Sequence, residues 1–425
     1  MATEVAVQQP GGTLGETTLG PPRSSTFHSL RYRDYRYLWQ GQIGAAASNW
    51  MEQIARPLLI YSLTDSAFLV GAIAATRMFP MLFIGVWAGV MADRMDKRKI
   101  LLVTKTITLA VHAITAALLL SGVIEPWMVF VTAFTAGSAM AFDQPARQSL
   151  IPHMVPPESI ANAVALNSAA MNVMRVGGPS IAGLILAAFD FGALYVVQSV
   201  IYVWVIFSML QIKTRTNDEP RSETSLLSDL KEGFRAASSD KAILYILLLS
   251  LALFIWGMPF QGVFVPLIVI EELGYGRTTV GLMLSSVGAG ALLGSLIVAT
   301  YGDTMRKRGV LMIAQVLLFA LSLLVFANAM SLFLAVPALM LAGAMQVSFM
   351  SINNAYVLGR TPRELQGRVM SLFSLDRGLV PFGALIGGLL AESLDAQMGL
   401  TLMASICLVC TIVITLAVPA LRRIQ

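Results

Sequence analysis

The stretch Gly89-Val-Met-Ala-Asp93-Arg94-Met-Asp96-Lys97-Arg98-Lys99 decides the fold, because it places a dense group of charges between two long apolar runs. The runs, 67–92 and 100–122, each exceed the roughly 20 residues that cross the hydrocarbon core of a bilayer. They predict a transmembrane hairpin. Lys and Arg concentrate in cytoplasmic loops, so the basic side chains predict that this turn lies inside the cell.

The turn also has a pattern that topology alone does not require. Gly89 lies four residues before Asp93, and Arg94 and Arg98 follow. Glycine lets two helices approach closely, and a carboxylate at a helix end can accept hydrogen bonds from the N-terminus of a neighbouring helix. One interpretation is a clasp that forms part of a cytoplasmic gate. The other is a basic anchor without a partner.

A second copy of the turn favours the clasp. Asp303-Thr-Met-Arg306-Lys307-Arg308 lies between the apolar runs 280–301 and 310–328. Another pair of segments has nearly the same offset, since Val155-Pro-Pro-Glu158 resembles Thr361-Pro-Arg-Glu364 and each opens a glycine-rich apolar segment. The repetition predicts two homologous halves.

The turn resembles the signature loop between the second and third helices of the major facilitator superfamily, and the two halves over residues 36–420 fit that family. The resemblance implies an all-α polytopic membrane protein with twelve transmembrane helices in two pseudo-symmetric six-helix bundles around a central cavity. The expected divisions are a disordered cytoplasmic tail (1–26), an N-terminal bundle (27–211), a cytoplasmic linker with an amphipathic helix (212–241), a C-terminal bundle (242–420) and a short cytoplasmic tail (421–425).

Composition agrees with a membrane protein. The 425 residues are 56% apolar and 12% charged, with a mean hydropathy of +0.73, which is too apolar for a soluble globular protein. The net charge of +5 comes from basic residues in short loops and predicts no nucleic-acid partner. Cys407 and Cys410 lie in the last apolar run without nearby histidines, so we interpret both as packing residues and expect no metal site.

Hydropathy predicts the membrane spans and their direction. The predicted outer connections together contain a single basic residue, Arg277, whereas every inner connection contains at least one Lys or Arg. Both termini are therefore expected inside. The predicted spans are 37–63, 66–92, 100–122, 126–146, 160–188, 192–211, 242–270, 278–301, 309–328, 331–357, 366–391 and 397–420.

Ionisable residues inside spans are costly, so each is a functional candidate. In the first span Glu52 and Arg56 are four residues apart and share a helix face. If they pair, Glu52 is ionised and structural. If the arginine has another partner, Glu52 in an apolar cavity becomes a proton carrier. Both interpretations remain open from the sequence.

The other intramembrane charges come from both halves. Arg77 lies near the middle of the second span and Arg175 near the middle of the fifth. Asp376 and Arg377 are adjacent in the eleventh span, so their side chains diverge on a helix and Asp376 needs another partner or a proton. We expect Glu52 and Asp376 to carry the coupled proton. The alternative is that these charges only lock helices together.

Two further motifs belong to the membrane ends and to helix packing. Asp143 and Arg147 close the fourth span in a Pro-Ala-Arg run and, with Arg94 and Arg98, could form a charge network at the gate. Gly178, Pro179 and Gly183 partly match the Gly-Pro motif that marks antiporters of the superfamily, although small residues and proline also occur wherever membrane helices kink and pack. The expected gate motif is Gly89, Asp93, Arg94, Arg98, Asp143, Arg147, Asp303, Arg306 and Arg308.

Within the superfamily, the Asp-Gln-Pro-Ala-Arg run and the segment Pro156-Pro-Glu-Ser-Ile-Ala-Asn-Ala163 resemble the drug-efflux branch that includes macrolide and siderophore exporters. The resemblance implies a monomeric transporter of the bacterial-type inner membrane that contacts lipid and exports an amphipathic small molecule in exchange for protons. The rivals are a lysophospholipid or metabolite carrier on the same fold and a non-transporting sensor. Nothing predicts an enzyme or a cofactor. The expected substrate contacts are Asn49, Trp50, Phe79, Phe142, Trp256, Phe260 and Phe349.

Overall fold

The computed structural model describes residues 26–214, 216, 241–302, 307–361 and 378–417, and these residues form helices and turns without a strand. Within them, the side chains at 86, 87, 89–94 and 241 are outside the description. The predicted amphipathic linker helix around Leu226 and the eleventh-span pair Asp376 and Arg377 also lie outside the described residues.

The first half of the chain forms six long helices with local signals at their ends. Asp65 has a left-handed backbone (φ 49°) and ends the first helix, and Asp96 and Asp190 cap the third and the sixth by accepting backbone N–H groups. The six helices are α1 (Arg33–Thr64), α2 (Ala67–Arg94), α3 (Lys97–Leu120), α4 (Pro126–Leu150), α5 (Ile160–Ala188) and α6 (Phe191–Leu210). Short 3-10 turns are η1 (His28–Arg31), η2 (Ile151–His153) and η3 (Pro157–Ser159).

The second half begins with an irregular helical segment. It consists of α8 (Lys241–Ala252), the π-helical η4 (Leu253–Gly257), the 3-10 turn η5 (Met258–Phe260), α9 (Phe264–Leu267) and the π-helical η6 (Ile268–Glu272). Broken helices are tolerated at membrane depth where protein surrounds them. The helices that follow are α10 (Arg277–Tyr301), α11 (Arg308–Ala327), α12 (Leu332–Arg360), α14 (Val380–Ser393) and α15 (Ala396–Ala417).

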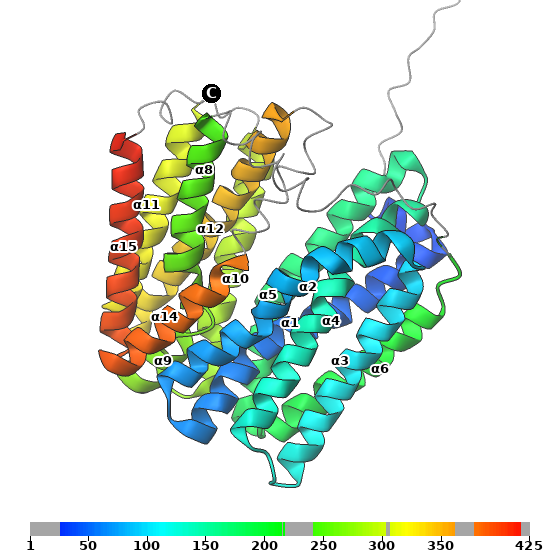
Figure 1. The fold of residues 1–425 in the computed structure, drawn as a ribbon, viewed down its shortest axis with the longest axis horizontal. Coiled ribbons are helices and arrows are strands. Elements are labelled where there is room, and N and C mark those ends of the chain that lie inside the picture. The colour runs from blue at the N-terminus through cyan, green and yellow to red at the C-terminus, as the bar shows by residue number, and fades with distance from the viewer. Residues whose placement is uncertain (1–25, 215, 217–240, 303–306, 362–377, 418–425) are drawn as a thin grey trace, which may run out of the picture.

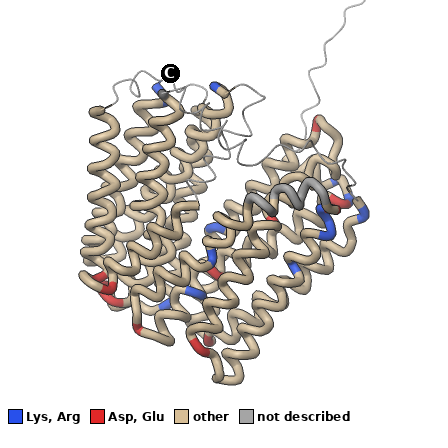
Figure 2. The backbone as a smooth tube through the Cα atoms, viewed as in Figure 1, with Lys and Arg blue, Asp and Glu red and all other residues tan. Residues whose placement is uncertain are grey.

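The membrane character of these helices follows from their length and composition. Among the described residues, nine segments are long and apolar enough to cross a bilayer, and Val380–Ser393 is a shorter apolar helix. The predicted count of twelve spans stays a prediction. Figure 2 shows that Lys, Arg, Asp and Glu lie mainly near the helix ends, with a few charged positions along the helices of the first half.

The two halves of the chain form two side-by-side bundles (Figure 1). They meet along two helix pairs, α5 with α10 and α2 with α14. We call the end where α1 ends and α2 begins the far end, and the end where α1 begins and α15 ends the terminal end. In Figure 1 the bundles approach each other toward the far end and diverge toward the terminal end.

Glycines and hydroxyls hold the halves together toward the far end. Gly71 of α2 lies against the backbone of Ala384 and Gly388 on α14, where a side chain would clash. Glu392, which follows on α14, accepts hydrogen bonds from Ser66 Oγ (3.2 Å) and from the backbone N–H of Phe68 (3.0 Å). This contact therefore fixes the start of α2 to the end of α14.

The pair α5 and α10 makes an equivalent contact. Gly183 lies against Gly281 and Thr278, and Ser180 Oγ lies 2.7 Å from Ser285 Oγ. Ser285 also donates to the carbonyl of Val176 (2.8 Å). Two small-residue contacts, α2 with α14 and α5 with α10, thus close the far end in this conformation.

Candidate substrate cavity and charge clusters

A cavity of about 320 Å³ lies between the two halves. Its walls come from α1, α2, α4 and α5 of the first half, from the irregular segment 258–263 and from α14. Five methionines line it, and this flexible side chain adapts to apolar ligands of different shapes. The five are Met78, Met81, Met140, Met171 and Met258.

Among the described residues that line this cavity Glu52 is the acidic group, and arginines surround it. Arg56 Nε donates to Glu52 Oε1 over 2.6 Å, and Arg77 Nη2 lies 3.4 Å from Glu52 Oε2. Glu52 and Arg56 are each only 2% exposed. Arg56 also donates to the carbonyl of Val129 and to Thr132 Oγ1, which joins α1 to α4. The pairing interpretation of Glu52 with Arg56 therefore describes this conformation.

Arg77 differs from Arg56 because part of it faces the cavity. Its side chain is 19% exposed, compared with 3% for Arg56. Its Nη2 donates to Asn49 Oδ1 over 2.6 Å. Asn49 and Arg77 thus lie side by side on the cavity wall, as a polar patch among methionines.

A second, polar cavity of about 140 Å³ lies inside the first bundle. Asn49, Glu52 and Arg77 line both cavities, so the second begins where the first ends. It continues to Asp143 and Arg147 near the end of α4. The polar groups of the first bundle are therefore continuous from Glu52 to that end of the helix.

Asp143 pairs with Lys105, a residue that the sequence interpretation did not include. Lys105 Nζ lies 2.6 Å from Asp143 Oδ1, and Arg147 Nε lies 3.6 Å from Asp143 Oδ2. Thr104 Oγ1 adds a hydrogen bond, and Arg147 donates to Asn167 Oδ1. Arg98, the partner expected for this network, instead donates to the carbonyl of Leu210 (3.0 Å). Arg98 therefore does not contact Asp143 in this conformation, and the Arg94 side chain lies outside the described residues, so the expected network stays a prediction.

His112 is the second residue that the sequence interpretation missed. It is 1% exposed, its Nδ1 lies 4.0 Å from Glu52 Oε1, and its Nε2 lies 3.3 Å from Ser48 Oγ. Lys105 and His112 both lie in α3. An ionisable group inside the apolar run 100–122 was the signal that could have identified both.

Arg175 of α5 lies over the indole ring of Trp50, 4.8 Å from the ring centroid. Among the described residues no carboxylate pairs with it, and its Nε has no hydrogen-bond acceptor. It lines a small space next to the central cavity. Trp50, Gln53 and Gln261 line both spaces.

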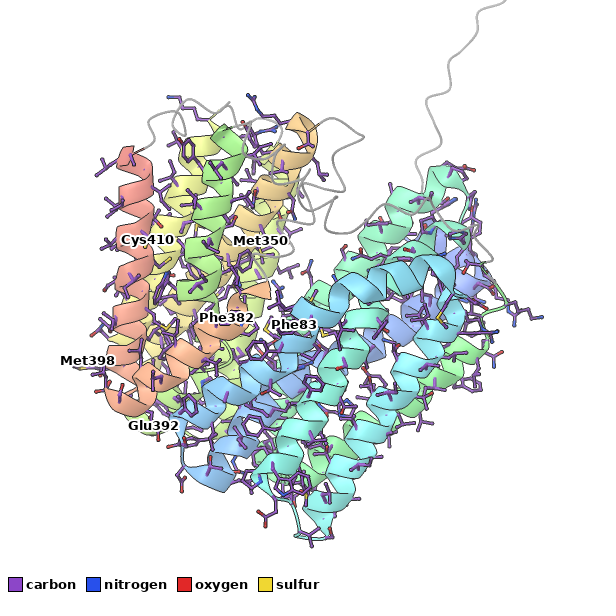
Figure 3. All side chains as sticks on the ribbon, in the orientation of Figure 1. Phe83, Met350, Phe382, Glu392, Met398 and Cys410 are labelled. Carbon is purple, nitrogen blue, oxygen red and sulfur yellow. The ribbon has the colours of Figure 1, made fainter. Side chains whose placement is uncertain are left out.

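The expected aromatic contacts have different surroundings. Trp50 lines the cavity, whereas Phe79 packs edge-on against Phe382 of α14 (5.7 Å). Figure 3 shows Phe382 and Phe83 on these two facing helices. Phe142 is half-buried against an apolar core within the first half. Trp256 is half-buried against a larger apolar core that contains residues of both halves.

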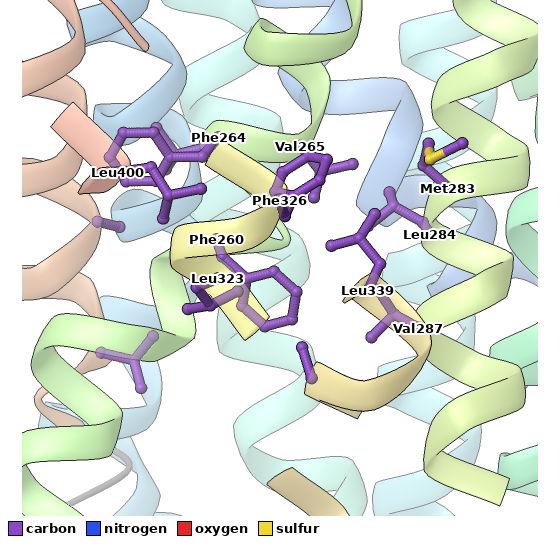
Figure 4. Packing of buried hydrophobic residues seen from close by; sticks show 14 of the residues in the cluster. Phe260, Phe264, Val265, Met283, Leu284, Val287, Leu323, Phe326, Leu339 and Leu400 are labelled. Atoms are coloured by element: carbon purple, nitrogen blue, oxygen red, sulfur yellow. The ribbon is translucent and has the colours of Figure 1, made fainter. Parts of the chain in front are cut away.

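Phe260 and Phe349 are not on the cavity wall in this structure. Both are 0% exposed. Phe260 packs against Phe319, and Gly257 leaves room for the Phe319 ring because a side chain there would clash with it. Figure 4 shows Phe260 within this apolar cluster. Phe260 follows the irregular turns of 253–260 and packs within the second bundle, so the expectation that it lines the cavity does not hold in this conformation.

The predicted gate motif is only partly described. Arg308 lies at the start of α11 and is half-buried. The description does not include the side chains of Asp93 and Arg94 or the contacts of Gly89, and it does not include Asp303 and Arg306 at all. The clasp therefore stays a prediction. Gly178 lies against Trp50 and Gly183 against α10, so these glycines, with Pro179 between them, serve close helix packing.

Comparison with known proteins agrees with this architecture. Residues 24–424 match the family of transmembrane secretion effectors. The chain is 24% identical to a staphyloferrin A transporter of Staphylococcus aureus over 363 residues, covering 84% of this chain and 89% of that protein. It is 21% identical to macrolide efflux protein A of Streptococcus pyogenes over 386 residues, covering 88% and 95%. It is 24% identical to the multidrug efflux pump Tap of Mycobacterium tuberculosis over 391 residues, covering 90% and 92%.

Solved structures show the same fold. A POT family transporter in complex with 5-aminolevulinic acid superposes with a TM-score of 0.76 at 12% identity, covering 94% of this chain and 98% of the other. A bacterial homologue of the human lysosomal transporter Spinster, in an inward-facing and unoccupied conformation, gives 0.68 at 13% identity, covering 92% and 96%. The homologues indicate a membrane efflux or secretion transporter, and the chain belongs to the transmembrane secretion effectors of the major facilitator superfamily.

Proposed function

We propose that this chain exports an amphipathic small molecule across the cell membrane by alternating access, and that inward movement of protons drives the export. The observation that supports this most is the cavity of about 320 Å³ whose wall is shared by both bundles. A site at the interface of two repeats is where secondary transporters bind substrate. Its volume falls in the range of small-molecule pockets, and its methionine-rich wall suits an apolar body.

Alternating access needs two conformations that close opposite ends. Here the far end is closed by the contacts of α2 with α14 and of α5 with α10. We assign the terminal end to the cytoplasm, because the basic loops predict both termini inside. In this proposal the conformation is open to the cytoplasm and ready to accept a molecule for export, and rocking of the bundles about the cavity exposes it outside.

Glu52 is our first candidate for the proton carrier. It borders both the central cavity and the polar cavity of the first bundle, so a proton can reach it from either. In this conformation Arg56 and Arg77 stabilise the ionised carboxylate. Arg77 is the more exposed partner, and its withdrawal in the other conformation would leave a buried carboxylate with less compensation, which favours protonation. Asp376 is the second candidate.

The test uses inverted membrane vesicles with an imposed pH difference as the only driving force. The probes are a macrolide and staphyloferrin A, the compounds named for two relatives, together with the fluorescent carboxylate dansyl-glycine. We expect Glu52→Gln, Asp376→Asn or both to keep probe exchange and to lose accumulation against a gradient. Glu125→Gln is the control, because Glu125 is exposed and its side chain caps no backbone group.

The outcome separates coupling from structure. If both Glu52→Gln and Asp376→Asn still concentrate a probe that the unmodified protein concentrates, neither residue carries the coupled proton. Glu52 would then serve only to hold Arg56 and Arg77 in place.

A further inference from the structure

The charges around the central cavity are unequal. Arg56 and Arg77 line it, Arg175 lines the space next to it, and Glu52 is the one described carboxylate on these walls. Asp376 and Arg377 lie outside the described residues, and the charges compared are those of the described walls. Charges inside a membrane protein are normally paired, so an excess of cations at this depth calls for an anion.

The single carboxylate among the described lining residues already has cationic partners. Both oxygens of Glu52 face arginines, Oε1 toward Arg56 and Oε2 toward Arg77. One negative charge between two guanidinium groups leaves a positive excess even before Arg175 is considered. The remaining partners of Arg56 and Arg77 are neutral oxygens of Val129, Thr132 and Asn49.

Arg175 is the least compensated of the three. Its described neighbour is the face of Trp50, and stacking on an aromatic ring stabilises a cation less than an ion pair does. Its Nε and the indole Nε1 of Trp50 are both without an acceptor among the described residues. The amide residues Gln53 and Gln261 complete this side of the cavity. The wall next to Trp50 thus presents donors and positive charge without a matching acid.

We propose that the cavity selects amphiphiles that carry a negative charge, and that Arg175 beside Trp50, supported by Arg77, binds the anionic group while the methionines hold the apolar body. The inference rests on the proposed export function and names its substrate class. Arginine suits this role because its planar group stays charged and binds carboxylates or phosphates through several N–H donors. A lipophilic cation would meet the same arginines as a repulsion.

The test compares ligands that share one fluorophore and differ in the charge of the attached group. Dansyl-glycine is a carboxylate, dansylcadaverine an ammonium and dansylamide is neutral. Binding to the purified full chain in lipid nanodiscs is followed by dansyl anisotropy. We expect the carboxylate to bind about tenfold more tightly than the ammonium, the scale of one charge-assisted hydrogen bond. Equal binding, preference for the ammonium or no binding of the carboxylate would overturn the proposal.

Variants locate the anion site. Arg175→Met should weaken dansyl-glycine about tenfold and leave dansylamide nearly unchanged. Arg277→Met is the matched control, since Arg277 also stacks on an aromatic ring (Phe191, 4.6 Å) but lies at the start of α10, away from the cavity wall. Arg175→Lys keeps the charge and should retain part of the preference. Unchanged dansyl-glycine affinity in Arg175→Met would refute the role of Arg175.

Two sources could supply the anion, a lipid headgroup or a free solute. Repeating the titration in nanodiscs with and without phosphatidylglycerol distinguishes them. If phosphatidylglycerol competes with dansyl-glycine, the site binds an anionic headgroup. If it does not compete, the site binds a free solute. Proton-driven movement of probes with no preference for the carboxylate would refute this inference and leave the export proposal intact. Carboxylate binding without proton-driven movement would refute the export proposal and leave the preference for anions intact.

Discussion

Replacing Gly281 by alanine tests whether the small-residue contact between α5 and α10 sets the balance of conformations. A Cβ at this position would lie 2.7 Å from the carbonyl oxygen of Pro179 and 2.9 Å from Gly183 Cα. Both atoms belong to the backbone of the other half, so no side-chain rotation relieves the clash. The helices must move apart, which opens the far end.

The size of the effect follows from the cost of overpacking. An added methyl group in a tight contact costs about 1–3 kcal/mol. In our mechanism the cost falls on the conformation closed at the far end, because the contact is broken when that end opens. The ratio of the two conformations should therefore shift about 5- to 150-fold toward the open far end.

Distances between spin labels at Phe189 and Tyr275 measure this shift. These residues are exposed near the far ends of α5 and α10, and they lie in different halves. Cys407 and Cys410 are first replaced by alanine so that only the labels react. We expect a longer distance population to grow in Gly281→Ala and transport of any exported probe to slow.

Gly177→Ala is the control, because a Cβ at 177 meets no atom within 4 Å although it lies on the same helix as Gly183. An unchanged distance distribution in Gly281→Ala would refute the reasoning. The same shift in Gly177→Ala would also refute it, since the effect would then come from the helix backbone and not from the contact.

Three further predictions follow from the site. Phe260→Ala should lower the free energy of unfolding by about 3–5 kcal/mol with little effect on dansyl-glycine affinity, whereas Trp50→Ala should affect the affinity more than the free energy of unfolding. Unfolding and anisotropy measurements check both variants. A large loss of affinity in Phe260→Ala would show that this residue contacts the ligand after all. Arg56→Met should cost about 3 kcal/mol of stability, at the low end for a broken buried pair because Arg77 remains, and adding Glu52→Gln should recover most of it; an equal loss in the double variant would argue against the pair. Asp93→Asn should favour the conformation open to the cytoplasm, and unchanged cysteine labelling in the cytoplasmic half of the cavity would contradict the clasp.

The sequence was sufficient for the family and the helical architecture because long apolar runs and the repeated turn are local signals. It was less informative about partners. Glu52 and Arg56 share a helix face, and their pair could be anticipated, but the approach of Arg77 depends on how α2 packs against α1. The pair of Lys105 with Asp143 could not be anticipated for a similar reason, since a contact between α3 and α4 has no signature within either helix.

Aromatic residues were harder to place. Phe260 and Trp256 lie in a segment with two π-helical turns and one 3-10 turn, so a regular helical period gives wrong side-chain directions there. Trp50, in the regular helix α1, reached the cavity as expected. Phe349 of α12 and Phe79 of α2 also do not line the cavity although their helices are regular, so the irregular backbone accounts only for Phe260 and Trp256.

The positive excess among the described residues around the cavity has an electrical consequence. A transporter that alternates access keeps its site in place and moves the membrane field across it, so the site is at the cytoplasmic potential in one conformation and at the external potential in the other. With the cell interior negative, each uncompensated positive charge favours cytoplasmic exposure by up to about 2.3 kcal/mol per 100 mV. The membrane potential would therefore favour the conformation of the empty protein that is open to the cytoplasm. An anionic substrate would cancel that bias when it binds, so the loaded protein would open to the outside more readily than the empty one.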